Sequence, residues 1–582
     1  MLSRHCIWIV LKRCSPFLLA GAILWSLPGY GLRPAPAVEP AVADPLRLAV
    51  LLVFDQFRGD YLSRWEKLFG EHGFRRLQTE GAWFTNCHYP YALTFTGSGH
   101  ASILTGCSPA EHGIIGNEWY DRVAGERISC VDDTRYMLVR GRADPAGVDR
   151  RGKSIGLSPT RMLTPTVGDA LKEATGGKSR VVGLSLKDRS AMLPAGHRAD
   201  AAYWFDSNDG TFITSTYYVQ RQQAWADQLN RERFADQWFG RDWVHVRAGL
   251  DYVPYSGPAD VEGADRGFGQ GRAFPHPLTG GRKVIGKEYF QALANSPFGN
   301  DLLLELTRRA IEGEQLGRHS VPDLLTVSFS SNDAVGHCWG PDSQEVLDIT
   351  LRSDQIVADL LALLDDKVGK GHYILALTAD HGVCPLPEVA RAQGKDGARD
   401  AADTLTTKAE AFLNSKFGNN QRGAHWLSAT EESWVYLNRQ LLRERGLQQA
   451  EVEYALAKWL KVQPGILEAY TRTGLLSNAP SENVFQEQVR RSFYPDRSGD
   501  VGVILKPYHL MTAVFARGTT HGTPHDYDTH VPLLVMGPGI RPGVHPERIT
   551  PQATAAILAR GLGIKPPATA RAPLPDGLFS DR

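Results

Sequence analysis

Short apolar runs that end close to acidic residues constrain the fold of this chain more than any other feature. Such runs occupy residues 46–54, 324–329 and 373–377, and two further runs, at 180–184 and 531–536, have the same character. Runs of this length without polar alternation are typical of strands that are covered on both faces, as in a parallel sheet between two layers of helices. The sequence therefore predicts an α/β fold, a three-layer sandwich with a mostly parallel central sheet.

The segment between the second and third of these runs predicts an amphipathic helix. Apolar residues recur with helical spacing from Val346 to Leu364, and Ser343 stands near the expected start. A strand, a helix and a strand in succession form a crossover unit, which places the two strands parallel to each other. A last helix is expected at residues 551–562.

Two long segments interrupt this pattern, at about residues 190–300 and 390–515. The first is rich in Tyr, Trp, Gly and Arg, and the second mixes helix-like and irregular stretches. We interpret both as inserted cap segments that cover or flank the ligand edge of the sheet. Residues 44–582 would then form one domain with two insertions.

The N-terminus has the features of an export signal. Three basic residues precede an apolar stretch at 17–27, and Ala41-Val42-Ala43 matches a small-x-small cleavage site. We therefore expect a signal peptide at residues 1–43 and a periplasmic or secreted mature protein. The alternative is an uncleaved membrane anchor, but a spanning helix needs about 20 apolar residues and this stretch is shorter.

The charge balance excludes one class of partner. Lys plus Arg equals Asp plus Glu, at 64 each. No global basic field is available to hold nucleic acid or an anionic membrane, so an anionic substrate must be attracted by local charge.

The cysteines indicate no thiolate metal cluster. Of seven cysteines, Cys6 and Cys14 fall in the predicted signal, and the remaining five form no CxxC pair. In an oxidising compartment one disulfide is expected, for which Cys107 and Cys130 are the candidates. The alternative is that all five thiols are free.

Acidic and histidine residues follow the apolar runs where a metal site would need them. Asp55 ends the first run, Asp333 and His337 follow the second, and Asp380 and His381 follow the third. The carboxyl ends of parallel strands meet at one edge of a sheet, so these side chains should converge. They supply more ligands than one tetrahedral zinc requires, which predicts two metal ions about 4 Å apart.

One further histidine is expected to complete this set. His521, His525 and His530 all lie shortly before the last apolar run. Their spacing alone does not choose among them.

Thr96 is the candidate nucleophile. Gly97 and Gly99 would let the backbone turn sharply, and a helix could begin near Ala101, which would place the hydroxyl at its positive end. A threonine hydroxyl becomes a good nucleophile only when a metal or a base removes its proton. The simpler interpretation, an N-cap threonine, is displaced here by the ligand-type residues elsewhere in the chain.

Three residues are candidates for binding an anionic substrate. Lys187 and Arg189 stand two apart after the run at 180–184, and in extended chain both would point the same way. They could clamp the oxygens of a dianionic phosphoryl group, and Asn117 could donate one more hydrogen bond. The alternative is a solvated charged loop.

Taken in order, these motifs resemble the alkaline phosphatase superfamily, and most closely its periplasmic branch with a threonine nucleophile and a Lys-x-Arg pair. The matching segments are Phe54-Asp55-Gln56-Phe57-Arg58, Thr96-Gly97-Ser98-Gly99-His100-Ala101-Ser102-Ile103, Gly116-Asn117-Glu118-Trp119, Lys187-Asp188-Arg189, Asp333-Ala334-Val335-Gly336-His337, Thr378-Ala379-Asp380-His381-Gly382 and His521-Gly522. They run through almost the whole mature chain.

The resemblance implies zinc-dependent hydrolysis of small phosphate monoesters at alkaline pH, through a phosphothreonine at Thr96. Asn117, Lys187 and Arg189 would bind the non-bridging phosphoryl oxygens. One zinc would lie among Asp55, Thr96, Asp380 and His381, and the other among Asp333, His337 and His521. His521 is assigned because the family's His-Gly pair falls there. An additional structural calcium stays open, as does the oligomeric state.

Two alternative functions remain. The first is a phosphodiesterase or nucleotide pyrophosphatase on the same fold, which the Lys187–Arg189 pair disfavours because those relatives lack it. The second is a secreted, inactive binding protein that keeps the metals for stability. No nucleic acid partner is expected, and a membrane partner only if the signal stays uncleaved.

Overall fold

The structure is a computed structural model that describes residues 46–140, 156–420, 423–477, 479–512 and 516–580. The chain divides into the units Met1–Asp44 and Pro45–Arg582, and all described residues belong to the second. The predicted signal peptide lies outside the described residues. Within the described part, no helix has both the length and the apolar character needed to cross a bilayer.

A ten-stranded sheet forms the centre of the fold, in the order β20-β2-β19-β12-β1-β11-β6-β7-β8-β5. Its middle five strands are parallel: β12 (Tyr373–Thr378), β1 (Leu48–Phe54), β11 (Asp323–Phe329), β6 (Val181–Ser185) and β7 (Ala201–Asp206). Every residue of these five strands is buried, which explains why their sequences show apolar runs without alternation. The predicted α/β fold with a mostly parallel sheet is confirmed.

The outer strands run in both directions. β19 (Leu533–Met536) pairs antiparallel with β12 and with β2 (Ala82–Phe84), and β20 (Gly543–His545) follows at that edge. At the other edge, β8 (Thr211–Ser215) pairs antiparallel with β7 and with β5 (Leu138–Val139). Because β19 is antiparallel, the residues before it approach the edge at which the parallel strands end.

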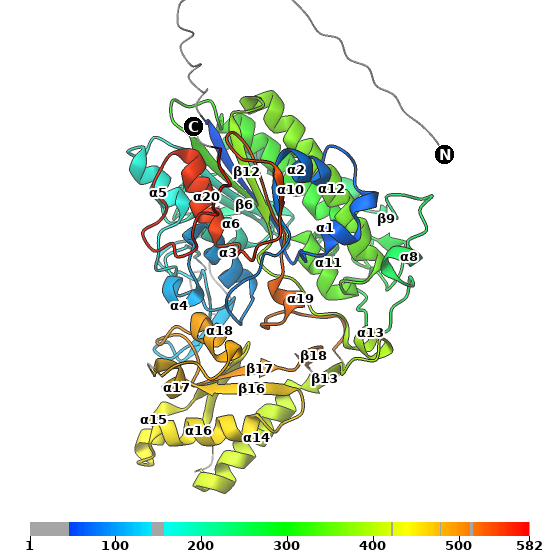
Figure 1. Cartoon of the computed structure of the whole chain (residues 1–582). Coiled ribbons are helices and arrows are strands. Elements are labelled where there is room, and N and C mark those ends of the chain that lie inside the picture. Colours follow the sequence, from blue (N-terminus) through cyan, green and yellow to red (C-terminus); the bar gives the residue numbers. More distant parts are fainter. Residues whose placement is uncertain (1–45, 141–155, 421–422, 478, 513–515, 581–582) are drawn as a thin grey trace, which may run out of the picture. The chain divides into compact units, whose positions relative to one another are not determined.

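Helices cover both faces of the sheet. α10 (Pro297–Gly313) and α12 (Gln344–Leu364) lie on one face, and α5 (Val167–Ala174), α6 (Asp188–Ala195) and α20 (Ala553–Leu562) lie on the other (Figure 1). The hydroxyl of Ser343 accepts a hydrogen bond from the backbone N–H of Val346 at 3.1 Å, so Ser343 is the N-cap of α12. The start of this helix is therefore where the sequence indicates it.

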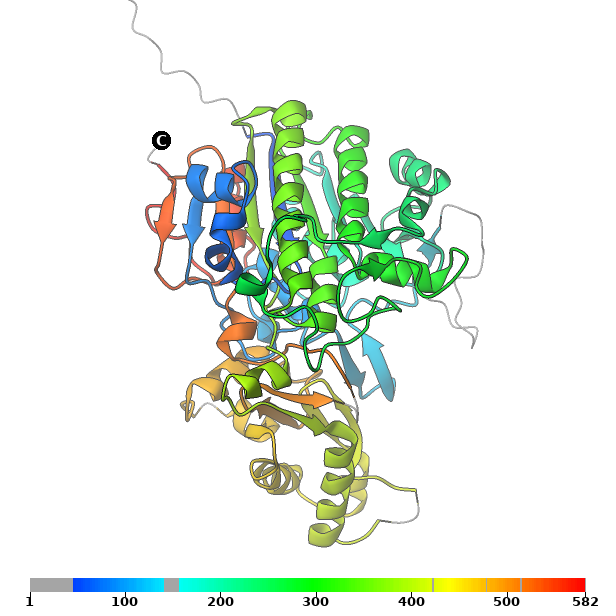
Figure 2. The same ribbon diagram turned by 90° about the vertical axis from the view of Figure 1, so that its right-hand side faces the viewer.

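The segment from about residue 398 to 512 contains a smaller sheet of four antiparallel strands. Their order is β14 (Leu427–Glu431), β15 (Trp434–Leu437), β17 (Val501–Leu505) and β16 (Ile466–Thr471). It carries the helices α14 (Ala402–Phe417) and α16 (Gln449–Leu460) and appears in colours from yellow-green to orange in Figure 2. We call residues 398–512 the cap.

The cap shares a hydrophobic cluster with the main sheet's helices. Trp434, Tyr470 and Phe493 of the cap belong to the same buried cluster as Phe95 and Trp119. Phe95 directly precedes the candidate nucleophile Thr96, and Trp119 stands two residues after Asn117.

The segment 190–300, in contrast to the cap, contributes strands to the central sheet. It supplies β7 and β8 before its irregular part begins.

The expected disulfide between Cys107 and Cys130 is wrong. All five cysteines in the described part of the chain are free thiols, and burial raises the pKa of the Cys130 thiol to about 12. Cys130 Sγ lies against Gly97 at the start of α3 (Thr96–Thr105), whereas Cys107 follows the end of that helix. A ten-residue helix is about 15 Å long, so it holds the two thiols too far apart to bond.

Candidate active site and metal centre

The candidate residues converge at the carboxyl ends of four neighbouring strands. β1 and β11 pair in register up to Phe54 and Phe329, so they end at the same level. β12 pairs with β1 and β6 pairs with β11, and both end close to this level. Asp55 follows β1 directly, and Asp380 and His381 follow β12. Because the strands end level, residues that are far apart in the sequence meet at one edge.

Asp55, Asp380 and His381 form one group, which we call the inner group. One potential ligand atom from each lies within 4.8 Å of the others, and all three residues are fully buried, at 0% exposure. His381 Nε2 lies 3.3 Å from Asp380 Oδ2 and 3.6 Å from Asp55 Oδ1. The Thr96 hydroxyl lies 3.2 Å from His381 Nε2, so the candidate nucleophile adjoins this group.

Asp333, His337 and His521 form a second group, the outer group, with the same spacing of ligand atoms. Asp333 and His337 are four residues apart on α11 (Ser331–Trp339), and His337 Nε2 lies 3.1 Å from Asp333 Oδ1. His521 arrives from the loop before β19, and its Nε2 lies 3.8 Å from the same oxygen. The His337 side chain is 34% exposed, so this group opens towards solvent.

Backbone carbonyls orient the histidines of both groups. The Nδ1 atoms of His337, His381 and His521 lie 2.7 to 2.9 Å from the carbonyl oxygens of Thr519, Gly382 and Thr94. Such a bond fixes the ring and leaves Nε2 free to bind a cation. His525 and His530 instead bring Nε2 to the carbonyl oxygens of Leu505 and Thr85, so neither joins a group.

Lys187 joins the two groups. Its Nζ donates to Asp55 Oδ2 at 2.7 Å and to Asp333 Oδ2 at 2.6 Å. Burial opposes its charge, but Asp333 and Asp55 raise the pKa of its ammonium group above the usual value. Lys187 is thus held as a cation at the centre of the site.

The electrostatics of the site favour a bound cation. Burial, and then repulsion from Asp380, raise the pKa of Asp55 well above its usual value despite the nearby Lys187. Burial also lowers the pKa of His521, with His381 and His337 adding to the effect. Asp55 Oδ1 is buried and accepts no hydrogen bond from any described residue, and Asp380 Oδ2 lies 3.1 Å from His100 Nδ1 and 3.3 Å from His381 Nε2. Crowded carboxylates, a free acceptor oxygen on Asp55 and the neutral imidazoles of His381 and His521 fit metal binding.

The remaining candidates for substrate binding are Asn117 and Arg189. Asn117 Oδ1 accepts a hydrogen bond from the backbone N–H of Gly97 at 2.8 Å. Arg189 is the second residue of α6, not part of an extended strand, and its Nε is buried without a hydrogen-bond partner among the described residues. Burial opposes its charge, while Asp188 and other nearby acids raise the pKa of its guanidinium group. This unpaired donor is suited to an anion.

The helix that carries Thr96 begins earlier than the sequence suggests. α3 starts at Thr96 itself, so Gly97 and Gly99 lie in its first turn and form no separate loop. A Cβ on Gly97 would lie 2.6 Å from the carbonyl oxygen of Gly116, and one on Gly99 would lie 2.3 Å from that of Asp380. These glycines therefore permit close approach of α3 to the site, which is a different reason from the turn that we expected.

Three residues of the site have no role in the sequence-based prediction. Gln56 donates hydrogen bonds to Asp380 and Asp333, and His100 Nδ1 lies 3.1 Å from Asp380 Oδ2. Glu432, in the β14–β15 turn of the cap, accepts a hydrogen bond from the backbone N–H of Asn117 at 3.0 Å. Gln56 directly follows Asp55, and His100 stands four residues after Thr96. This closeness in sequence to predicted site residues is the signal that could have found them.

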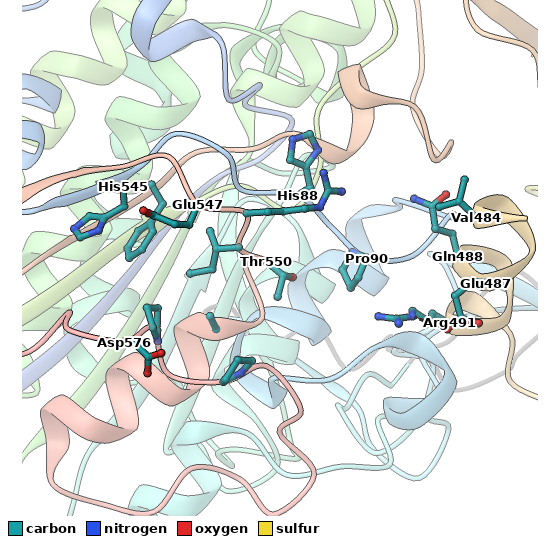
Figure 3. A pocket seen from close by; sticks show the side chains of 16 residues that line it. His88, Pro90, Val484, Glu487, Gln488, Arg491, His545, Glu547, Thr550 and Asp576 are labelled. Atoms are coloured by element: carbon teal, nitrogen blue, oxygen red, sulfur yellow. Dashed lines mark hydrogen bonds and ion pairs between the residues drawn. The ribbon is translucent and has the colours of Figure 1, made fainter.

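A separate cavity of about 730 Å³ contains none of the predicted site residues. Figure 3 shows Val484, Glu487 and Arg491 of α18 (Val484–Ser492) on one side, and His545 and Asp576 on the other. Both acidic and basic side chains line it, among them Glu547, Arg548 and Asp576. It therefore lacks the convergent acidic and histidine side chains of the inner and outer groups.

Comparison with known proteins gives consistent matches over most of the chain. The model of the type I phosphodiesterase / nucleotide pyrophosphatase family matches residues 49–519. Alkaline phosphatase PhoV of Synechococcus elongatus is 35% identical over 521 residues, which cover 87% of this chain and 88% of the relative. Alkaline phosphatase PafA of Elizabethkingia meningoseptica is 35% identical over 506 residues, which cover 86% of this chain and 89% of the relative.

A solved structure supports the same relationship. The crystal structure of wild-type alkaline phosphatase PafA superimposes with a TM-score of 0.84 at 33% identity, covering 92% of this chain and 99% of that one.

Proposed function

Because the chain belongs to the type I phosphodiesterase / nucleotide pyrophosphatase family, we propose that it is a zinc-dependent phosphatase that hydrolyses phosphate monoesters through a phosphothreonine at Thr96. The observation that carries this proposal is the position of the Thr96 hydroxyl, 3.2 Å from His381 in a group of three potential metal ligands. The alkaline phosphatase relatives at 35% identity support the same reaction class.

In the proposed reaction, Thr96 would act as the nucleophile and the inner and outer groups would hold the metal ions. Thr96 Oγ1 forms a bond to phosphorus as the bond from phosphorus to the leaving oxygen breaks, and water later cleaves the phosphothreonine to release phosphate. Zinc ions in the inner and outer groups would supply positive charge for ionisation of the hydroxyl and for the departing oxygen. Each group offers both imidazole nitrogen and carboxylate oxygen, a mixture that suits zinc better than magnesium or calcium.

The cationic side chains would select the charge of the substrate. Lys187 and Arg189 would face the non-bridging phosphoryl oxygens, with Asn117 donating one further hydrogen bond. A monoester dianion carries more charge on those oxygens than a diester monoanion. The pair should therefore stabilise the transition state of monoester hydrolysis more strongly.

Two alternative functions remain, and the first has specific support. The family description names phosphodiesterases and nucleotide pyrophosphatases, so diester hydrolysis is the alternative. A secreted binding protein without turnover is the other, and would keep its metals but hydrolyse neither substrate. The N-terminal signal features support export to the periplasm or the medium in either case.

The test combines metal analysis with rates on two matched substrates. We expect purified mature protein to hold two zinc ions per chain and to hydrolyse p-nitrophenyl phosphate at alkaline pH with a far higher kcat/KM than bis-p-nitrophenyl phosphate. A higher kcat/KM on the diester than on the monoester would instead identify the protein as a phosphodiesterase. No turnover of either substrate with zinc in place would favour the binding protein.

A further inference from the structure

Gln56 lies between the two groups and has an unusual backbone. It directly follows Asp55, is only 3% exposed, and has a φ of +68°, in the left-handed region that side chains other than glycine rarely adopt. Residues held in this way persist where the surrounding structure demands them, and they occur often at functional sites. The contacts of Gln56 indicate what the demand is.

The backbone and the side chain of Gln56 reach different groups. Its backbone N–H donates to Asp380 Oδ1 of the inner group at 3.1 Å. Its side-chain Nε2 donates to Asp333 Oδ1 of the outer group at 2.7 Å. Gln56 therefore holds one carboxylate in each group, and it does so from a left-handed backbone conformation.

The packing around the amide leaves it little freedom. A Cβ built on Gly336 of α11 would lie 1.8 Å from Gln56 Oε1, so the absence of a side chain at Gly336 makes room for the amide against the helix that carries Asp333. Lys187 approaches the other carboxylate oxygen of Asp333, Oδ2. With Gln56 on Oδ1 and Lys187 on Oδ2, the rotation of the Asp333 carboxylate is defined.

We propose that Gln56 is a positioning residue that sets the Asp333 carboxylate for cation binding in the outer group, while its backbone holds Asp380 of the inner group. This inference rests on the proposed two-zinc function. Hydrogen-bond partners of ligating carboxylates commonly change metal affinity about 10-fold to 100-fold when they are removed. Only the outer group depends on the side chain, because every variant keeps the backbone N–H.

The test measures zinc affinity directly in the full mature protein. We expect wild type to bind two zinc ions in competition with a chromophoric chelator, and Gln56→Ala to weaken one of them about 10-fold or more without changing the other. Gln56→Gly should lose the same affinity but unfold at a higher temperature than Gln56→Ala, since glycine adopts the left-handed backbone without strain. Gln355→Ala, on the exposed face of α12, is the matched control and should leave both affinities unchanged.

A double variant identifies the affected group. His337→Ala removes a ligand of the outer group, and adding Gln56→Ala to it should leave the affinity of the remaining zinc unchanged. Two wild-type affinities in both Gln56 variants would overturn the role of Gln56 and leave the proposed function standing. Fewer than two zinc ions in wild type would overturn both.

Discussion

The inner and outer groups have similar ligands but different surroundings. The inner residues follow directly on buried strands and are 0% exposed, whereas the outer group is built from α11 and a loop, and its His337 side chain is 34% exposed. The inner group adjoins the Thr96 hydroxyl, and the outer group is the one that reaches solvent. In the proposed mechanism, the buried group would therefore serve the nucleophile and the open group would serve the leaving oxygen.

The two groups also differ in the pKa of their carboxyl groups, as Asp55 and Asp333 show. Burial raises the pKa of Asp55 well above its usual value, whereas His337 and Lys187 outweigh burial and hold the pKa of Asp333 well below it. Without a bound cation, burial favours the neutral form of Asp55 even though Lys187 lies 2.7 Å away, whereas His337 and Lys187 together stabilise the charged form of Asp333. The inner group should therefore gain more from a metal ion, and should release it less readily.

The largest expected effect is that of metal removal. Exhaustive chelation with EDTA should abolish turnover, and zinc should restore it better than magnesium because each group contains imidazole nitrogen. During partial chelation the outer zinc should leave first, since His337 is exposed and the inner ligands are not. Measuring zinc per chain alongside the remaining activity checks this order. Equal loss rates for the two ions would break the contrast between the groups.

The next largest effect is that of the nucleophile. Thr96→Ala should lower kcat for p-nitrophenyl phosphate at least about 1,000-fold, because the covalent step is lost, while zinc content stays at the wild-type level. Thr96→Ser keeps a hydroxyl at the same position and is the matched control, with much of the activity retained. Undiminished turnover in Thr96→Ala would show that Thr96 is not the nucleophile and that the inner group does not act through it.

Much of this contrast could be predicted from the sequence, because the inner group depends on strands. Asp55 and Asp380 follow apolar runs whose burial forces them into a parallel sheet, and the carboxyl ends of such strands must meet. The helical spacing of Asp333 and His337 is equally visible. The choice of His521 from three histidines could not be made from spacing, because it depends on β19 being antiparallel and on a bond to Thr94, 427 residues away.

What the sequence did not predict depends on tertiary geometry. The role of Gln56 follows from a left-handed φ, and that of Gly99 from a close approach to the backbone of Asp380. Glu432 reaches Asn117 from a cap strand pair more than 300 residues away. The disulfide prediction failed because cysteine counting does not reveal that a whole helix separates the two thiols.

An intermediate effect is expected at Lys187, the residue that touches both groups. Lys187→Ala should lower kcat/KM for the monoester about 100-fold and for the diester only a few-fold, since the dianion loses more stabilisation when a cation is removed from a buried site. Rates on the two p-nitrophenyl substrates at equal zinc content measure the ratio. A parallel loss on both would mean that Lys187 organises the carboxylates without selecting charge.

The smallest effect tests how the outer group is tied to the fold. Asp528 is fully buried, and its Oδ2 accepts hydrogen bonds from the backbone N–H and the hydroxyl of Thr523, two residues after His521. Its Oδ1 has no hydrogen-bond partner among the described residues, and burial raises the pKa of this carboxyl to about 7. The native protein therefore keeps Asp528 neutral up to a higher pH than the unfolded chain does.

The sign of the pH dependence follows from that pKa. Stability that comes from neutral Asp528 is complete below about pH 4 and is lost as the pH rises through about 7, with a slope of at most about 1.4 kcal/mol per pH unit. Asp528→Asn stays neutral and keeps an oxygen for Thr523, so its free energy of unfolding should gain on wild type between pH 4 and pH 7 and run parallel above pH 8. Urea unfolding of both proteins across this range measures the difference. A difference in unfolding free energy that stays constant with pH would contradict this expectation. It would mean that a protonated Asp528 does not help to hold the loop that carries His521.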